Sequence, residues 1–196
     1  MQEKPRRIRP SYEDNKNLTV VNFFGGPGCG KSTTAAFLFG NMKVNDFKVE
    51  LIHEVSKDFV WEDWGHIFGE QDWIFAHQHQ HRLTRRLIGH DIDYAVVDSS
   101  ILLSLFYMPD DFPQSFRPFV RDVFDSYNNI NIFIDRNPDL PYVQAGRNED
   151  ERQAIEIDNR IRQYFKDTNT FAYHVQAGKN AAADCLDIVH RHPQAK

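Results

Sequence analysis

The stretch "VVNFFGGPGCGKSTTAAFLFG", residues 20–40, decides the fold. Residues 25–32 fit the pattern G-x-x-x-x-G-K-[ST], with an apolar, strand-like run before them and a helix-forming run after them. Glycines let consecutive backbone N–H groups turn inward, and a helix N-terminus adds positive charge, so such a loop surrounds a polyphosphate. We predict a nucleoside-triphosphate site in which Lys31 reaches the β- and γ-phosphates and Ser32 ligates Mg²⁺. The alternative is a degenerate loop that binds no nucleotide.

The loop also supplies the other predicted contacts to the nucleotide. They are Gly26, Gly28, Cys29, Gly30 and Thr33. Cys29 is interpreted as a residue that tolerates the bend, without thiol chemistry of its own. It and Cys185 are expected to be reduced, which predicts a cytoplasmic protein.

Composition bounds the class of protein. A chain of 196 residues with 41% hydrophobic content suits a single domain with a small lid. The net charge of −5 excludes a bulk nucleic-acid coat protein, although "KPRRIRP" (residues 4–10) is a local basic arm. No apolar run approaches the roughly 18 residues that a membrane span needs. We expect a basic tail over 1–16, one domain over 17–190 with a lid at about 137–152, and a C-terminal tail over 191–196.

The hydrophobic pattern predicts five short strands that alternate with helices. The strands are expected at 18–24, 49–54, 94–100, 130–136 and 170–175. The helices are expected at 31–43, about 70–89, after residue 100, about 114–127 and about 149–168. An apolar stripe on the second of them is predicted from Trp73, Ala76, Leu83, Leu87 and Ile88. This alternation is typical of a three-layer α/β fold, a five-stranded parallel sheet with helices on both faces. Ligands bind such sheets beyond the carboxyl ends of the strands, where charged residues follow the predicted strands: Lys31, Glu54, Asp98, Asp135 and Arg136.

Four blocks give the chain a family resemblance. They are "FFGGPGCGKSTTAAFLF", "VELIHEVSKDFVWE", "YAVVDSSILLSLFY" and "FIDRNPDLPYVQAGRNEDERQAIEID", and they cover most of residues 18–165. In this order they resemble the P-loop kinases of the nucleoside/nucleotide kinase group, and more narrowly a bacteriophage-type family of small P-loop kinases. The resemblance implies ATP, Mg²⁺ and, if the protein is phage-encoded, the host cytoplasm. Some similar phage proteins are simply called ATPases, and others resemble kinases of 5-hydroxymethyluridine in phage DNA.

Two carboxylates at strand ends are the predicted catalytic acids. Asp98 is interpreted as the Mg²⁺ carboxylate, the alternative being an N-cap for the following helix. The resemblance to deoxynucleoside kinases places Glu54 opposite the acceptor hydroxyl, where it can take a proton. Its alternative is a surface acid that caps the next helix. "DSS" follows the third strand where a thymidylate kinase has D-R-Y or D-R-S, which argues against that assignment.

Arginines frame the predicted lid. Kinase lids bring arginines over the phosphates, where they stabilise the developing charge and help to exclude water. Arg147 and Arg152 are the predicted catalytic arginines, and Gly146 gives the hinge its freedom. Arg136 is a predicted nucleotide contact, with a salt bridge to Asp135 as its alternative.

The sequence says less about the phosphate acceptor than about the nucleotide. Aromatic residues at 59, 61, 64 and 68 either stack a base or pack in the core. The histidines at 77, 79 and 81 and the arginines at 82, 85 and 86 are interpreted as a polar helix face, with a metal site or a phosphate contact as alternatives. We predict an ATP- and Mg²⁺-dependent kinase of a nucleotide-type acceptor, including modified DNA. The alternatives are a free nucleoside or nucleoside monophosphate kinase and a P-loop NTPase without a small acceptor.

Overall fold

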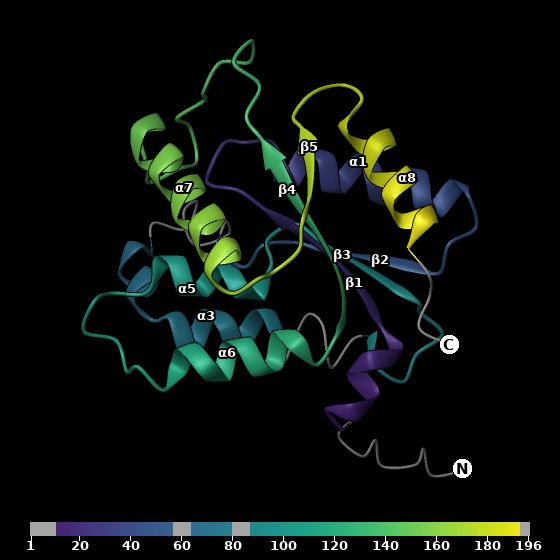
Figure 1. Cartoon of the computed structure of the whole chain (residues 1–196), viewed down its shortest axis with the longest axis horizontal. Helices are drawn as coiled ribbons and strands as arrows, with labels where there is room; N and C mark the ends of the chain where they lie inside the picture. Colours follow the sequence, from purple (N-terminus) through teal and green to yellow (C-terminus); the bar gives the residue numbers. More distant parts are fainter. Residues whose placement is uncertain (1–10, 57–63, 80–86, 193–196) are drawn as a thin grey trace.

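A computed structural model shows the architecture of the chain and describes residues 11–56, 64–79 and 87–192. Its centre is a parallel sheet in the strand order β2-β3-β1-β4-β5 (Figure 1). The strands are β1 (Thr19–Phe24), β2 (Val49–Ile52), β3 (Tyr94–Val97), β4 (Asn128–Asp135) and β5 (Tyr173–Gln176). This is the predicted five-stranded α/β sheet, so the fold class is confirmed.

Helices cover both faces of this sheet (Figure 1). The α-helices are α1 (Lys31–Val44), α3 (Gln71–Ala76), α5 (Ser104–Tyr107), α6 (Phe116–Asp125), α7 (Glu151–Asp167) and α8 (Ala181–Arg191). Short 3-10 helices are η1 (Glu13–Asn17), η2 (Gly65–Gly69) and η4 (Ile101–Leu103).

The side chains of β1 show why there are two helical layers. Val20 and Phe24 belong to one buried cluster, together with residues of α3, α5, α6 and α7. Val21 and Phe23 belong to a second cluster, together with residues of α1 and α8. Successive side chains of a strand point to opposite faces, so an apolar run on β1 needs a cover on each side.

The helix predicted over 70–89 differs from what the structure shows. Within the described residues α3 ends at Ala76, and a short π-helical turn follows over 77–79. The predicted apolar stripe is also wrong in part, because Trp73 is 42% exposed and Ala76 is exposed. The buried side instead carries Gln71, Ile74, Phe75, Gln78 and His79, at a helical spacing that mixes polar with apolar residues. Leu83 lies outside the described residues.

Two segments at the ends of the domain were not predicted as helices. The predicted tail 1–16 contains most of η1, where Asn15 is 1% exposed and its Nδ2 donates to Ser126 Oγ at 2.8 Å. Near the C-terminus, α8 packs against α1 and buries Cys185 and Val189. Both segments are short, so contacts with the rest of the domain stabilise them more than local propensity does.

Candidate functional site

The glycine-rich loop between β1 and α1 is shaped by what packs against it. Gly28 has φ of +76°, and a Cβ there would lie 2.6 Å from Cε2 of Tyr142. A Cβ on Gly26 would lie 2.3 Å from the Ala154 carbonyl oxygen. Real Cβ atoms do not approach neighbours this closely, so both positions require glycine, and the loop lies directly under residues 142 and 154.

Lys31 begins α1 and turns back under the loop. Its Nζ donates to the carbonyl oxygens of Gly25 at 2.7 Å and Gly26 at 3.2 Å, and the residue is only 9% exposed. A buried ammonium beneath a bend of glycines, at the start of a helix, suits a polyphosphate, because every nearby donor carries positive charge.

An ion pair that the sequence analysis did not predict braces the same loop. Asp158 of α7 is 2% exposed and accepts from the Gly26 N–H and from Arg136 Nε, each at 2.5 Å. Arg136 Nη2 in turn donates to the Pro27 carbonyl at 2.7 Å. Asp158 stands 22 residues after Arg136, so only the packing of α7 on the sheet brings them together. The spacing of Asp158 after Ala154 on an amphipathic helix was the available signal, since it places the carboxylate on the inward side.

This brace changes the interpretation of Arg136. It is not among the residues that line the cavity, and it does not pair with Asp135. Asp135 instead accepts from Arg162 at 2.8 Å and interacts with His174 at 3.0 Å. In this structure Arg136 holds the nucleotide loop from behind.

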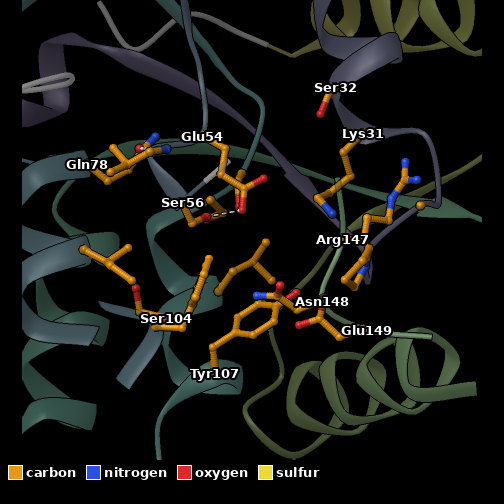
Figure 2. Close-up of a pocket in the computed structure, with 18 of the residues that line it drawn as sticks. Lys31, Ser32, Glu54, Ser56, Gln78, Ser104, Tyr107, Arg147, Asn148 and Glu149 are labelled. Atoms are coloured by element: carbon orange, nitrogen blue, oxygen red, sulfur yellow. Dashed lines mark hydrogen bonds between the residues drawn. The ribbon is translucent and has the colours of Figure 1, made fainter. Parts of the chain in front are cut away.

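A cavity of about 320 Å³ opens from the loop along the carboxyl edge of the sheet (Figure 2). Its phosphate side is lined by residues of the loop and the start of α1: Pro27, Gly28, Gly30, Lys31, Ser32 and Thr33. The rest of the cavity includes Glu54, Ser56, Phe68, Gln71, Ile74, Gln78, Leu103, Ser104 and Tyr107 in its lining, and the predicted lid adds residues 145–149. A cavity of this size fits a small organic ligand.

Glu54 is the carboxylate of β2 that reaches this cavity. It lies two residues beyond the end of the strand, and its Oε1 accepts from Ser56 Oγ at 2.5 Å. Figure 2 shows Glu54 and Lys31 pointing into the same space. The structure thus brings together the two residues that the sequence analysis assigned to opposite ends of one transfer.

Arg147 comes to the cavity from the lid. Its guanidinium lies 5.5 Å from the centre of the Tyr142 ring, and its Nη1 donates to the Val143 carbonyl. Tyr142, whose hydroxyl donates to the Glu149 carbonyl at 2.6 Å, packs on Gly28. Arg152 is placed differently: it is exposed on the first turn of α7 and does not line the cavity.

Asp98 follows β3 directly and is 3% exposed. Its backbone N–H donates to the Ile52 carbonyl at 3.0 Å, so the ends of β2 and β3 are tied together. The residues after it, Ser99 and Ser100, line the cavity, whereas Asp98 does not. The helix-cap alternative belongs to Ser100, whose Oγ accepts from the Leu102 N–H. Ser32 and Asp98 remain the predicted Mg²⁺ residues.

The oxygen donors at this edge fit a hard cation that phosphates help to bind. Ser32 stands beside the phosphate side of the cavity, and the β1 and β3 strands that lead to it and to Asp98 are neighbours. Within the part of the chain that the structure describes, no group of three histidine, cysteine, aspartate or glutamate side chains could hold a metal by itself.

Burial sets the protonation of two groups at the site. It raises the pKa of Tyr107 well above the usual range, with the charges of Glu54 and Glu149 adding to the effect. Tyr107 is therefore a neutral hydroxyl donor on the wall of the cavity. Burial also raises the pKa of the Cys29 thiol. A neutral, 2% exposed Cys29 agrees with its interpretation as a residue without thiol chemistry.

The structure describes only some of the remaining residues that were predicted to bind the acceptor. Phe68 lines the cavity, whereas Trp64 is 47% exposed and does not. The polar-face interpretation is wrong for His79, which is 1% exposed and hydrogen-bonds Tyr127 through Nε2 at 2.9 Å. His77 stacks on Trp73. The basic arm 4–10, aromatic residues 59 and 61, His81 and the arginines at 82, 85 and 86 lie outside the described residues.

Comparison with known proteins gives a family and a distant structural neighbour. A family model described as AAA domain matches residues 20–181. Curated proteins gave no match. Among solved structures, a mutant of the APS kinase CysC from Mycobacterium tuberculosis is 17% identical over 74% of this chain and 99% of that chain, with a TM-score of 0.37. None of the described helices is long and apolar enough to cross a bilayer.

Proposed function

The chain belongs to the AAA domain family of P-loop NTPases, and from this premise we propose that it is an ATP-dependent kinase. Its acceptor in this proposal is a hydroxyl of a nucleotide-type substrate. One observation carries the proposal: a single cavity is lined both by Lys31 and Ser32, the predicted phosphate-binding residues, and by Glu54. An enzyme that only hydrolyses ATP needs room for a water, whereas this cavity is also lined by Phe68, Gln78 and Tyr107, which lie outside the glycine-rich loop and are available to an acceptor.

The residues of the cavity suggest how transfer proceeds. The acceptor O–H lies against Glu54, which takes the proton as the oxygen bonds to the γ-phosphorus. The bond from the γ-phosphorus to the bridging oxygen breaks, and ADP leaves. Lys31 and Arg147 stabilise the negative charge on the transferring group. Mg²⁺, held by Ser32 and Asp98, would supply further neutralisation of the phosphate oxygens.

The finer proposal for the acceptor is the hydroxymethyl group of 5-hydroxymethyluridine in phage DNA. It is supported by the resemblance of the sequence to phage kinases and by Phe68 on the wall of the cavity, where a base would stack. A base in a duplex must leave the helix before its substituent can meet a phosphate in a cavity of this kind.

The test offers γ-labelled ATP with a panel of acceptors: DNA that contains 5-hydroxymethyluracil, unmodified DNA, free nucleosides and nucleoside monophosphates. Label in the modified DNA alone supports both levels of the proposal. Label in a free nucleoside or nucleotide alone keeps the kinase and overturns the DNA acceptor. ATP hydrolysis at one rate with or without every acceptor overturns the kinase and leaves a P-loop NTPase.

A further inference from the structure

Gln78 occupies an unusual position beside Glu54. It is 5% exposed, and it lies just after α3 on the wall of the cavity (Figure 2). Its Oε1 accepts from the Val55 N–H at 3.1 Å, and its Nε2 donates to the His53 carbonyl at 3.2 Å. One side-chain amide therefore binds the backbone on both sides of Glu54.

The geometry of an extended chain explains why one amide can do this. In a strand, the carbonyl before a residue and the N–H after it point to the same side. β2 is an edge strand, and Glu54 lies two residues past its end. Gln78 supplies the donor and the acceptor that a neighbouring strand would have supplied.

Fixing those two groups fixes the direction of the Glu54 side chain. The His53 carbonyl belongs to the peptide unit before Glu54, and the Val55 N–H belongs to the unit after it. When both units are held, the Cα–Cβ bond of Glu54 has one direction, and the bond from Ser56 then orients the carboxylate. A general base must stand within hydrogen-bond reach of the proton that it takes, so this orientation matters for rate.

We propose that Gln78 is the positioning residue for Glu54, acting through the backbone of residues 53–55 and not by contact with the substrate. This proposal rests on the proposed function of Glu54 as the base. It predicts that Gln78 governs kcat and leaves ATP binding unchanged, because the phosphate side of the cavity is built by other residues.

The decisive variant is Gln78→Met, which keeps the size of the side chain and removes both hydrogen bonds. With the best acceptor of the panel, we expect kcat to fall about 10- to 100-fold while the KM for ATP stays within about twofold, as expected when a reacting group is misplaced by about 1 Å. In a Glu54→Gln background the same change should lower kcat by less than about twofold, since residues that act through one another are not additive. Gln163→Met, at an exposed site of α7, is the matched control.

Hydrogen exchange gives a second measurement that does not need the reaction. The Val55 amide should exchange at least about tenfold faster in Gln78→Met, because its hydrogen bond is lost. Unchanged exchange overturns the inference, and so does an equal loss of kcat with and without Glu54. If the wild-type protein phosphorylates no acceptor, the proposed function fails, and the exchange measurement still decides whether Gln78 holds residues 53–55.

Discussion

At the scale of single residues, Lys31 is the charged side chain that lies within the predicted phosphate site itself. Lys31→Ala should lower phosphoryl transfer by at least about 10²–10³-fold, because a charge aimed at the transferring group is lost. The fold should remain, since the ammonium of Lys31 bonds only loop carbonyls in this structure. The measurement is label transfer beside thermal unfolding.

Lys43→Ala is the control for Lys31. It removes a lysine of the same helix that forms a half-exposed salt bridge to Glu50 at 3.3 Å and lies 5.6 Å from the centre of the Phe39 ring. Such a bridge contributes about 1 kcal/mol at most, so activity should stay near that of the wild type. A folded Lys31→Ala protein that works at the wild-type rate would show that the site is assigned wrongly.

Glu54 and Asp98 should differ in the kinetic parameter that they control. Glu54→Gln should lower kcat by about 10²–10⁴-fold with little change in ATP affinity, because it removes a general base. Asp98→Asn should raise the Mg²⁺ concentration needed for half-maximal rate. Glu50→Gln, on the strand that leads to Glu54, is the control. A Glu54→Gln enzyme with a kcat within about threefold of the wild-type kcat would show that Glu54 is not the general base.

At the scale of elements, α7 connects the lid to the nucleotide loop. The predicted lid, about 137–152, lies between the end of β4 and the first residues of α7. Arg136, just before it, and Asp158, further along α7, both contact the glycine-rich loop. One network of contacts therefore holds the predicted lid and the glycine-rich loop together.

Asp158→Ala tests this brace. It leaves Arg136 without its carboxylate and the Gly26 N–H without its acceptor, and breaking a buried pair from one side costs about 3–5 kcal/mol. Urea unfolding should show this loss, whereas Glu156→Gln, at an exposed position of the same helix, should change the free energy of unfolding by less than about 0.5 kcal/mol. A loss below about 1 kcal/mol for Asp158→Ala would contradict the brace.

Helix α8 gives the pH dependence of stability a specific source. Burial raises the pKa of Cys185 from an ordinary 9.0 to about 12. Above pH 9 the unfolded chain loses this proton and the folded chain keeps it, so the free energy of unfolding falls as pH rises toward 12, by up to about 1.4 kcal/mol per pH unit. Below pH 9 both states keep the proton, and the contribution is fully present.

The measurement compares wild-type protein with Cys185→Ala by urea unfolding at pH 8, 9.5 and 10.5. The variant should be less stable at pH 8, because it loses packing. The difference in free energy of unfolding between wild type and variant should become smaller as the pH rises. Val189→Ala, at another buried position of α8, is the control, and its difference in free energy of unfolding from the wild type should not change with pH. A constant difference for Cys185→Ala would mean that its thiol does not titrate as proposed.

At the scale of the whole molecule, charge limits any contact with DNA. The net charge is −5, and the concentrated basic segment holds Lys4, Arg6, Arg7 and Arg9. If DNA carries the acceptor, four cations release few counterions, so log Kd against log salt should have a slope no steeper than about 4 in magnitude. Deleting residues 1–10 should flatten that slope, measured by fluorescence anisotropy, and an unchanged slope would assign DNA binding to another surface.

The sequence by itself determined the sheet, the loop and the edge of the sheet at which Lys31, Ser32 and Glu54 gather. Strand periodicity and the G-x-x-x-x-G-K-S run are local patterns, and parallel strands bring their carboxyl ends together whatever the details of packing. Lys31, Ser32 and Glu54 could therefore be assigned to one edge before any coordinates were known. The same logic predicted a nucleotide contact for Arg136. The sequence shows that Arg136 follows a strand, but it does not show that Asp158 is its partner.

Only the tertiary structure decided which polar side chains face the cavity and which support it. Asp158 and Gln78 lie far along the chain from backbone groups that they hold, 132 residues from Gly26 and 23 from Val55, and no sequence pattern marks such backbone partners. The apolar stripe of α3 was misassigned for a related reason. Its buried side and the turn that follows include Gln71, Gln78 and His79. Gln78 and His79 can be buried because tertiary neighbours satisfy their hydrogen bonds, whereas Gln71 donates to the nearby Phe68 carbonyl.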